Sequence, residues 1–427
     1  PPSLTHPVRP RHRRRTGLLR GGAGLGALLA TLPLTAIAAP QGASVVRGTA
    51  TVAPVDANGL TQVNQTSNRA VIHWDSFNVS SGETVNFRQP GTSSVTLNRV
   101  MAGNGTIIAG NVSANGRVFL LDPRGVLVTQ GATLDVNSLV LSTASTDDDA
   151  FMDGRYSFNG ADTQPGAAIV NRGAILADPT GFVALVGANV SNFGTITAQL
   201  GTVALAAAPA FSLDFVGDGL ISFDVSGTLN GSSLGDLPSA LVANTGTIQA
   251  NGGTVHLTVS QAVRLVDNAI SLGGVVEATT IGTSAGAIVL SASTGDVSVS
   301  GRISAVGDGA GEKGGTVGVR GDTVTLGAGA VVNVSGEGGG GSVKIGSDTA
   351  PVQSVDIAAT ATIQADGTRT GAGGTVALSA AGSISHAGRI TANGLGAGAG
   401  RGGTVAMQAG TRATIDGTVT ASAQGST

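Results

Sequence analysis

Short stretches of alternating apolar and polar residues, each ended by glycine or asparagine, recur along most of the chain. The phrase Gly-Thr-Val, followed by small and apolar residues, begins at positions 201, 253, 315, 374 and 403, with a close variant at 341. Related phrases lie between them, among them GTITA at 194–198 and GRITANG at 388–394. A period of two predicts β-strands of about three to five residues. The spacings are about one to three multiples of a unit of roughly twenty to thirty residues, the range of stacked repeats.

Strands this short bury a hydrophobic face only when identical coils stack on one another. In such a stack each strand pairs in parallel with its counterpart one coil on, ~4.8 Å away, and glycine and asparagine supply the corners. We therefore expect an all-β protein, a parallel β-helix (solenoid) of ~15–19 coils. Aromatic residues make up only 3% of the chain, which disfavours a β-propeller; a β-sandwich remains the alternative.

The first coil of a stack must be covered, because an open strand edge pairs with other molecules. The least repetitive segment is 44–160, and it holds a large share of the aromatic side chains. We expect the amino-terminal cap there.

The first 39 residues have a different character from the rest. They contain six arginines and no acidic residue, and an apolar stretch leads to AIA at 36–38. A positive head, an apolar middle and an A-x-A end are typical of a secretory signal peptide. We predict that residues 1–39 are this peptide, with cleavage beside Ala38 and Ala39.

Loss of the signal peptide leaves an acidic chain. The formal charge changes from 23 − 26 = −3 to 17 − 26 = −9, which argues against a nucleic-acid partner. The chain has no cysteine, so neither a disulfide nor a thiolate metal site is available.

No arrangement of residues points to catalysis. His73, His256 and His386 are far apart and lack a partner nucleophile or ligand set. We interpret the carboxylates of Asp147–Asp149 and Asp153 as a solvated acidic loop, since calcium ligands alternate along a loop around a glycine turn. We expect no enzyme, metal, cofactor or small-molecule substrate. A polysaccharide-degrading β-helix is a weaker alternative, because it needs clustered Asp and Lys or Arg, which are not evident here.

Three segments closely resemble the two-partner secretion domain, which is the amino-terminal haemagglutination-activity domain of filamentous-haemagglutinin-like exoproteins. The version resembles that of the high-molecular-weight adhesins. The segments are 64–100, 110–128 and 132–143. Within and after them, the elements that carry the resemblance are Trp74, Phe77-Asn78, ETVNF at 83–87, Gln89-Pro90, LNRV at 97–100, NGRVFL at 115–120 and FMDGRYSFNG at 151–160.

The resemblance implies a right-handed parallel β-helix with an amino-terminal cap and small extra-helical hairpins. It also implies recognition, in an unfolded or partly folded state, by the periplasmic domains of a dedicated outer-membrane transporter. The residues that the resemblance assigns to transporter recognition or folding are Asn98, Arg99, Val100, Asn115, Gly116, Asp122, Pro123, Arg124, Gly125 and Val126.

The family's Asn-Pro-Asn-Gly-Ile turn corresponds to residues 122–126, and both of its asparagines are changed here. Asp122 is able to replace the first asparagine by capping backbone N–H groups. Arg124 tolerates the left-handed region less well than asparagine, so we expect a somewhat different turn. The turn is either a structural corner or a direct transporter contact, and the two roles are compatible.

The resemblance also suggests a domain division. We predict a secretion domain at 40–275 and continuing β-helical repeats at 276–427 that begin an adhesive stalk. The whole protein would be a large bacterial adhesin, exported through the periplasm and then secreted or held at the outer membrane. Its host-cell or matrix receptor has no signature in the sequence. The alternative is the delivery part of a contact-dependent growth inhibition toxin. The chain starts at Pro1 and stops within a repeat, so we expect it to be a piece of a longer protein.

Overall fold

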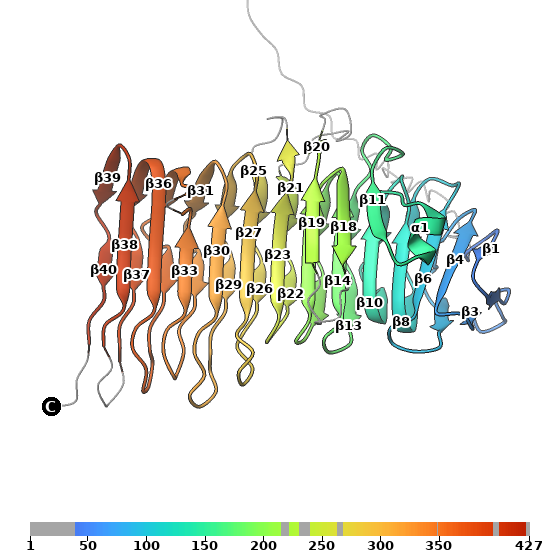
Figure 1. The fold of residues 1–427 in the computed structure, drawn as a ribbon, viewed down its shortest axis with the longest axis horizontal. Coiled ribbons are helices and arrows are strands. Elements are labelled where there is room, and N and C mark those ends of the chain that lie inside the picture. Colours follow the sequence, from blue (N-terminus) through green and yellow to red (C-terminus); the bar gives the residue numbers. More distant parts are fainter. Residues whose placement is uncertain are drawn as a thin grey trace, which may run out of the picture. The chain divides into compact units, whose positions relative to one another are not determined.

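The computed structural model describes residues 39–214, 222–229, 240–262, 268–347, 349–395 and 401–423. Ala38 and the rest of the predicted signal peptide lie outside these ranges, and Ala39 is the first described residue. In the described part, 35 strands form one sheet that winds through successive coils (Figure 1). No helix in these ranges is long and apolar enough to cross a membrane.

Each coil contributes strands to three columns, which we call faces A, B and C, and every pairing along a face is parallel. Face A contains β3 (Leu60–Gln65), β5 (Thr84–Arg88), the first part of β8 (Asn111–Leu121) and of β10 (Thr133–Ser142), β13 (Ala174–Ala177), β16 (Thr195–Ala198), β22 (Thr247–Gln249), β26 (Val275–Glu277), β29 (Arg302–Ser304), β32 (Val331–Asn333), β35 (Thr362–Gln364), β37 (Arg389–Thr391) and β40 (Thr418–Thr420).

Face B contains β4 (Arg69–Trp74), β6 (Val95–Val100), the second parts of β8 and β10, β14 (Phe182–Gly187), β17 (Thr202–Ala207), β23 (Thr254–Val259), β27 (Ala287–Ala292), β30 (Thr316–Arg320), β33 (Ser342–Ile345), the first part of β36 (Thr375–His386) and β38 (Thr404–Ala409). Face C contains β7 (Thr106–Ile108), β9 (Val126–Val128), β12 (Ile169–Asn171), β15 (Val190–Asn192), β21 (Ala240–Asn244), β25 (Asn268–Leu272), β28 (Val297–Val299), β31 (Thr323–Leu326), β34 (Val352–Ile357), the second part of β36 and β39 (Arg412–Ile415).

The interior of the coils is one continuous column of aliphatic side chains. Alternate residues of each strand point inward, so that Val203 stacks on Val255 and Leu205 on Leu257 of the next coil. These side chains are fully buried. The alternating pattern of the sequence therefore corresponds to side chains that point alternately into and out of the coils, as they do in a pleated strand.

The glycine of the Gly-Thr-Val phrase is required by the close approach of successive coils. A Cβ added at this glycine would lie only 2.0 to 2.1 Å from a glycine carbonyl oxygen of the preceding coil. Only glycine fits a backbone contact of this kind. The same overlap occurs at Gly201, Gly253, Gly315, Gly341, Gly374 and Gly403.

The first coil is covered by two antiparallel strands. β1 (Ser44–Arg47) pairs with β4, and β2 (Ala50–Val52) pairs with β3. The expected cap is therefore present, but most of the aromatic residues of 44–160 lie elsewhere. Trp74, Phe77 and Phe87 pack inside the first coils.

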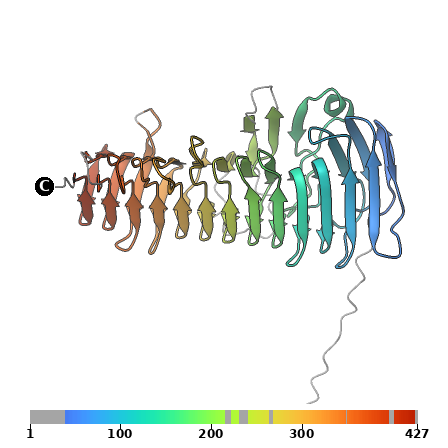
Figure 2. The same ribbon diagram turned by 90° about the horizontal axis from the view of Figure 1, so that it is seen from below.

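The remaining aromatic residues form a second hydrophobic cluster outside face B. The covering elements are α1 (Asp148–Met152), β11 (Tyr156–Asn159), β18 (Ala210–Asp214) and β19 (Ser222–Ser226), which lie beside the stacked coils (Figure 2). Phe119 of β8 contacts Phe151 and Tyr156 at ring distances of 5.6 and 5.7 Å, and Phe158 stacks on Phe211 at 4.4 Å. A short parallel pair, β20 (Thr228–Leu229) with β24 (Gln261–Ala262), completes these additions. The predicted parallel β-helix with cap and extra-helical hairpins is confirmed.

The predicted number of coils is wrong. In the described residues face B has twelve strand positions, from β4 to β38, against the expected ~15–19. Val203 pairs directly with Val255, so the longer interval between them is one coil that contains the β18–β19 excursion. Val255 pairs with Ile288 and Ile288 with Val317. A coil that begins with GAIVL at 286–290 therefore lies between two Gly-Thr-Val phrases.

Candidate functional site

The ten predicted site residues lie at two corners of the early coils, at the end of β6 and at the start of β9. Asp122, Pro123, Arg124 and Gly125 connect face B to face C, while Asn115 and Gly116 connect face A to face B. Residues Asn98, Arg99 and Val100 end β6, next to the first of these corners.

Asp122 organises the turn from a fully buried position. Its Oδ1 accepts the backbone N–H of Arg124 at 3.0 Å, and its backbone carbonyl accepts the N–H of Gly125 at 3.0 Å. Its Oδ2 accepts the Thr106 hydroxyl at 2.8 Å. The predicted capping role of Asp122 is therefore confirmed. Burial raises the pKa of the Asp122 carboxyl, although the bonds from Arg124 and Thr106 oppose this shift.

Arg124 connects the turn to the end of β6. Its Nε donates to Asp122 Oδ1 at 3.0 Å, and its Nη2 donates to the carbonyl oxygen of Val100 at 2.9 Å. Among the described non-glycine residues only Thr180 and Leu200 have positive φ. Arg124 does not adopt the left-handed conformation, in keeping with the lower tolerance of arginine for that region. That the turn differs from the family's turn stays a prediction.

Gly125 is the residue that takes the left-handed conformation, with φ of +106°. A Cβ here would lie 2.7 Å from the carbonyl oxygen of Ala168 in the next coil, and that same oxygen accepts the N–H of Val126 at 3.0 Å. Gly125 is thus constrained both by its backbone angle and by the coil stacked on it.

Asn98 is a buried polar residue in an otherwise aliphatic inward column. It stacks between Ile72 and Leu120 of the neighbouring coils. Its Oδ1 accepts the indole N–H of Trp74 at 3.0 Å, and its Nδ2 donates to the carbonyl oxygen of Phe119 at 3.2 Å. Asn98 therefore has the hydrogen bonds that a buried polar group needs. The same bonds satisfy the indole N–H of Trp74 and connect neighbouring coils.

Arg99 points to the other side of β6 and anchors α1. Its guanidinium donates to Asp148 Oδ1 at 2.6 Å and to Ser145 and Thr146. His73 Nε2 lies 2.9 Å from the second oxygen of Asp148. Asp147 caps the helix through Ala150 N at 2.7 Å.

Asp147, Asp149 and Asp153 are exposed, as the interpretation of a solvated acidic loop expected, but that interpretation is wrong for Asp148 and for the loop itself. The run starts a short helix, where carboxylates are favoured by the exposed N–H groups. Asp148 is largely buried against Arg99 and His73, while Asp149 and Asp153 form exposed pairs with Arg47 and Arg155. In the described residues no three histidine or acidic side chains gather as a metal-ligand set.

The corner between faces A and B contains a second buried polar network. Asn115 accepts the backbone N–H of Gln89 at 2.7 Å and donates back to its carbonyl oxygen at 2.9 Å. Gln89 Nε2 donates to Thr96 Oγ1 at 3.0 Å, and Thr96 donates to Gln65 at 2.5 Å. A Cβ on Gly116 would lie 2.8 Å from the backbone carbonyl oxygens of Gly91 and Ser94, so this glycine is required.

The structure brings 97–100 and 122–126 together but places 115–116 at a different corner. Sequence reasoning missed Thr106 and Ala168 as partners of these residues, and Gln65 as the partner of the neighbouring Thr96. Nothing in the spacing identifies them, since each belongs to a neighbouring coil rather than to the motif.

The asparagines that end three strands of face C form a third polar feature, and the sequence did not predict that they bond to one another. Asn171 donates to Asn192 at 2.8 Å, and Asn192 donates to Asn244 at 2.7 Å. These buried amides form a ladder at the end of face C, with one asparagine in each of three successive coils.

The fold and these corners define a class of protein: an amino-terminally capped β-helix whose motif residues hold successive coils together. The chain belongs to the TPS secretion domain family, whose model matches residues 36–305. Over 104 residues it is 42% identical to the heme/hemopexin-binding protein of Haemophilus influenzae strain Rd, and 40% identical to a second protein of that name from Haemophilus influenzae. Each match covers 24% of this chain but only 11% of the relative.

A solved structure has a similar fold. The HMW1 secretion domain of Haemophilus influenzae superposes with a TM-score of 0.70, at 24% identity, over 89% of this chain and 99% of that one. The resemblance inferred from the motifs is confirmed by the family match. The matched range includes all ten predicted site residues.

Proposed function

We propose that this chain is the secretion domain of a large exported bacterial adhesin and that a cognate two-partner transporter of the outer membrane recognises it. The family match over residues 36–305 is the observation that supports this proposal. The domain acts before it is folded and then starts the β-helix, so its function is export and folding rather than catalysis. The domain would occupy residues 40–275, and the coils of 276–427 would begin the stalk.

The adhesin assignment concerns the part of the protein beyond these coils. The matched relatives are named for binding heme or hemopexin. The matched segment makes up only 11% of each relative, which fits a long exoprotein with a short secretion domain. We propose export through the periplasm followed by release or retention at the cell surface.

The ten site residues divide into two groups by exposure. Six residues, Asn98, Val100, Gly116, Asp122, Gly125 and Val126, are buried, so in the folded state they act on coil formation. The other four, Arg99, Asn115, Pro123 and Arg124, are partly or fully exposed and are available to a partner. We propose that the turn serves folding first and that Pro123 and Arg124 contact the transporter while the turn forms.

The test is secretion of the chain by cells with and without the cognate transporter. Export should require the transporter and should yield a product that begins near Ala39 or Pro40. Asn98→Ala and Gly125→Ala should reduce the secreted amount about tenfold or more, because each disrupts contact between coils. Gly131→Ala is the matched control: its φ is +89°, but a Cβ there meets nothing within 4 Å.

Refolding of the purified variants separates the two roles of the turn. Slow or incomplete refolding of Gly125→Ala would assign the defect to folding, whereas normal refolding with lost secretion would assign it to recognition. Secretion without any transporter, or equal loss in Gly131→Ala, would contradict the proposal.

A further inference from the structure

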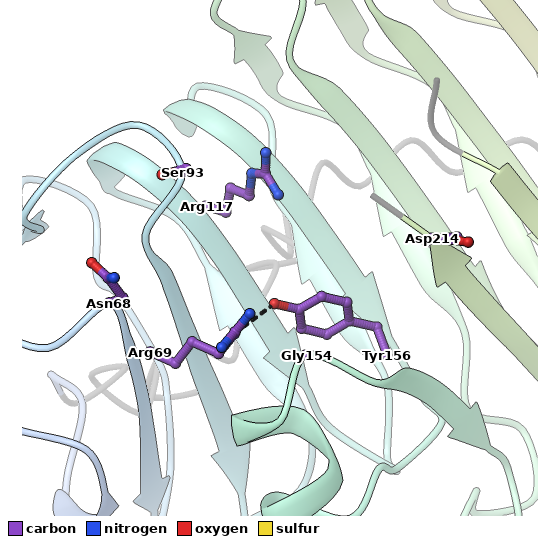
Figure 3. A pocket seen from close by; sticks show the side chains of 7 residues that line it. All are labelled: Asn68, Arg69, Ser93, Arg117, Gly154, Tyr156 and Asp214. Atoms are coloured by element: carbon purple, nitrogen blue, oxygen red, sulfur yellow. Dashed lines mark hydrogen bonds between the residues drawn. The ribbon is translucent and has the colours of Figure 1, made fainter. Parts of the chain in front are cut away.

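A polar pocket of about 420 Å³ lies between face B and the layer that covers it (Figure 3). Coil residues line one side and residues of the outer layer line the other. The lining residues are Asn68, Arg69, Ser93, Arg117, Gly154, Tyr156 and Asp214. The pocket is separate from the turn at Asp122 and was not predicted from the sequence.

Two guanidinium groups are placed in this pocket by strand register. Arg69 pairs with Val95, and Val95 pairs with Arg117. The two arginines therefore occupy one outward column of face B, two strands or about 9–10 Å apart. Because pleated strands fix the side of the sheet on which a residue lies, both side chains must face the outer layer.

The outer layer holds Arg69 in position. Arg69 Nε donates to the Tyr156 hydroxyl at 3.0 Å, as drawn in Figure 3, and Nη1 donates to the carbonyl oxygen of Met152 at 3.1 Å. A Cβ at Gly154 would lie 2.7 Å from Arg69 Nη2, so glycine leaves room for the guanidinium. Among the described residues no carboxylate lies within ion-pair distance of Arg69.

Arg117 is half-buried, and burial lowers the pKa of its guanidinium. A cation that has lost part of its hydration gains more from an anion than an exposed one does. Among the described lining residues the one carboxylate is that of Asp214, at the edge of the pocket. Two arginines and this carboxylate give the described lining a formal charge of +1, which suits a monoanion better than a phosphate dianion.

We propose that this pocket binds an acidic sugar of the uronic acid class, with its carboxylate on Arg117 and Arg69. Guanidinium groups match the planar geometry of a carboxylate. Asn68, Ser93 and the Tyr156 hydroxyl supply neutral groups that exchange hydrogen bonds with sugar hydroxyls. The volume lies in the range of small-molecule sites, and one ring fits it.

The probe is glucuronate, titrated against the full chain by ligand-observed NMR. Glucose and acetate are the comparison ligands, since glucose has the sugar hydroxyls without the carboxylate and acetate has the carboxylate without the sugar. We expect saturable binding of glucuronate that is at least about fivefold tighter than either. A glucuronate-terminated oligosaccharide distinguishes a site for chain ends, which would bind it at least equally well, from a site for the free sugar only.

Variants test the assignment of residues. Arg117→Gln should weaken glucuronate binding about tenfold, whereas Arg88→Gln, which removes an exposed charge outside the pocket, should leave it within about twofold. Asp214→Asn removes the competing carboxylate and should tighten binding about two- to threefold. Because a misfolded protein would not bind glucuronate more tightly, a gain in affinity in this variant cannot be explained by loss of structure.

The proposal is overturned if glucuronate does not bind, if acetate or glucose binds as tightly, or if Arg117→Gln binds as the parent does. It is independent of the proposed transporter. We expect Arg117→Gln to be secreted normally, so loss of sugar binding with intact export separates the two functions.

Discussion

Asp122 has a capping role that the sequence predicted and a complete burial that it did not. Its place in a Pro-Gly turn predicted a side chain that caps backbone N–H groups, and it does so. Its complete burial was not predictable, because Thr106 and the stacked coils that bury it are distant in sequence.

Burial of Asp122 predicts a dependence of stability on pH. The folded pKa lies above the ordinary value of 3.8, so just above that pH the folded protein retains a proton that the unfolded chain has lost. The contribution of Asp122 to the free energy of unfolding therefore falls as pH rises through this window. Asn at this position has no proton to lose and keeps the bond to the Arg124 N–H.

We therefore expect Asp122→Asn to gain stability relative to the parent as pH increases from about 3 to about 7. The measurement is the unfolding midpoint in denaturant at several pH values, followed by circular dichroism. Asp135→Asn, which removes an exposed carboxylate of β10 instead of a buried one, is the control for the loss of one negative charge. A constant difference for Asp122→Asn would contradict the prediction.

At the scale of elements, the outer layer over face B depends on one carboxylate. Asp148 joins α1 to β6 through Arg99 and to β4 through His73, and α1 in turn covers Phe119 and Tyr156. The sequence showed the acidic run and the aromatics but not their connection. Arg99 and His73 lie on strands of earlier coils, and these strands come close to the acidic run only once the chain has wound into the β-helix.

Asp148→Asn should detach α1 without unfolding the coils. We expect a cost of about 1–2 kcal/mol, less than for a fully buried pair because the partners keep some exposure. Hydrogen exchange should accelerate in 147–158 and stay slow in the inward-facing strands. Asp149→Asn, beside the exposed Arg47 pair, is the matched control and should not change exchange; equal effects of both variants would refute the role of Asp148.

At the scale of the whole molecule, the repeat phrase predicted stacking, while the excursions concealed the number of coils. The residues between Ala207 and Ala240 share glycine, serine and aliphatic residues with the coils, and they differ chiefly in three phenylalanines, at 211, 215 and 223. Composition alone does not separate an inserted hairpin from another turn of the helix. The glycine of the phrase, by contrast, has a purely local cause, which is the approach of one backbone to the next.

That cause makes the stack testable as a one-dimensional array. Gly315→Ala places a Cβ about 2.1 Å from the carbonyl oxygen of Gly286 and should destabilise these coils by about 1–3 kcal/mol. Because each coil contacts only its neighbours, hydrogen exchange should increase in β27, β30 and β33 and remain slow from β4 to β17. Gly318→Ala is the control in the same strand, since a Cβ there meets nothing within 4 Å. Faster exchange throughout the stack would instead mean that the coils unfold as one cooperative unit. A defect in the later coils would then also unfold the capped first coils, which the transporter is proposed to recognise.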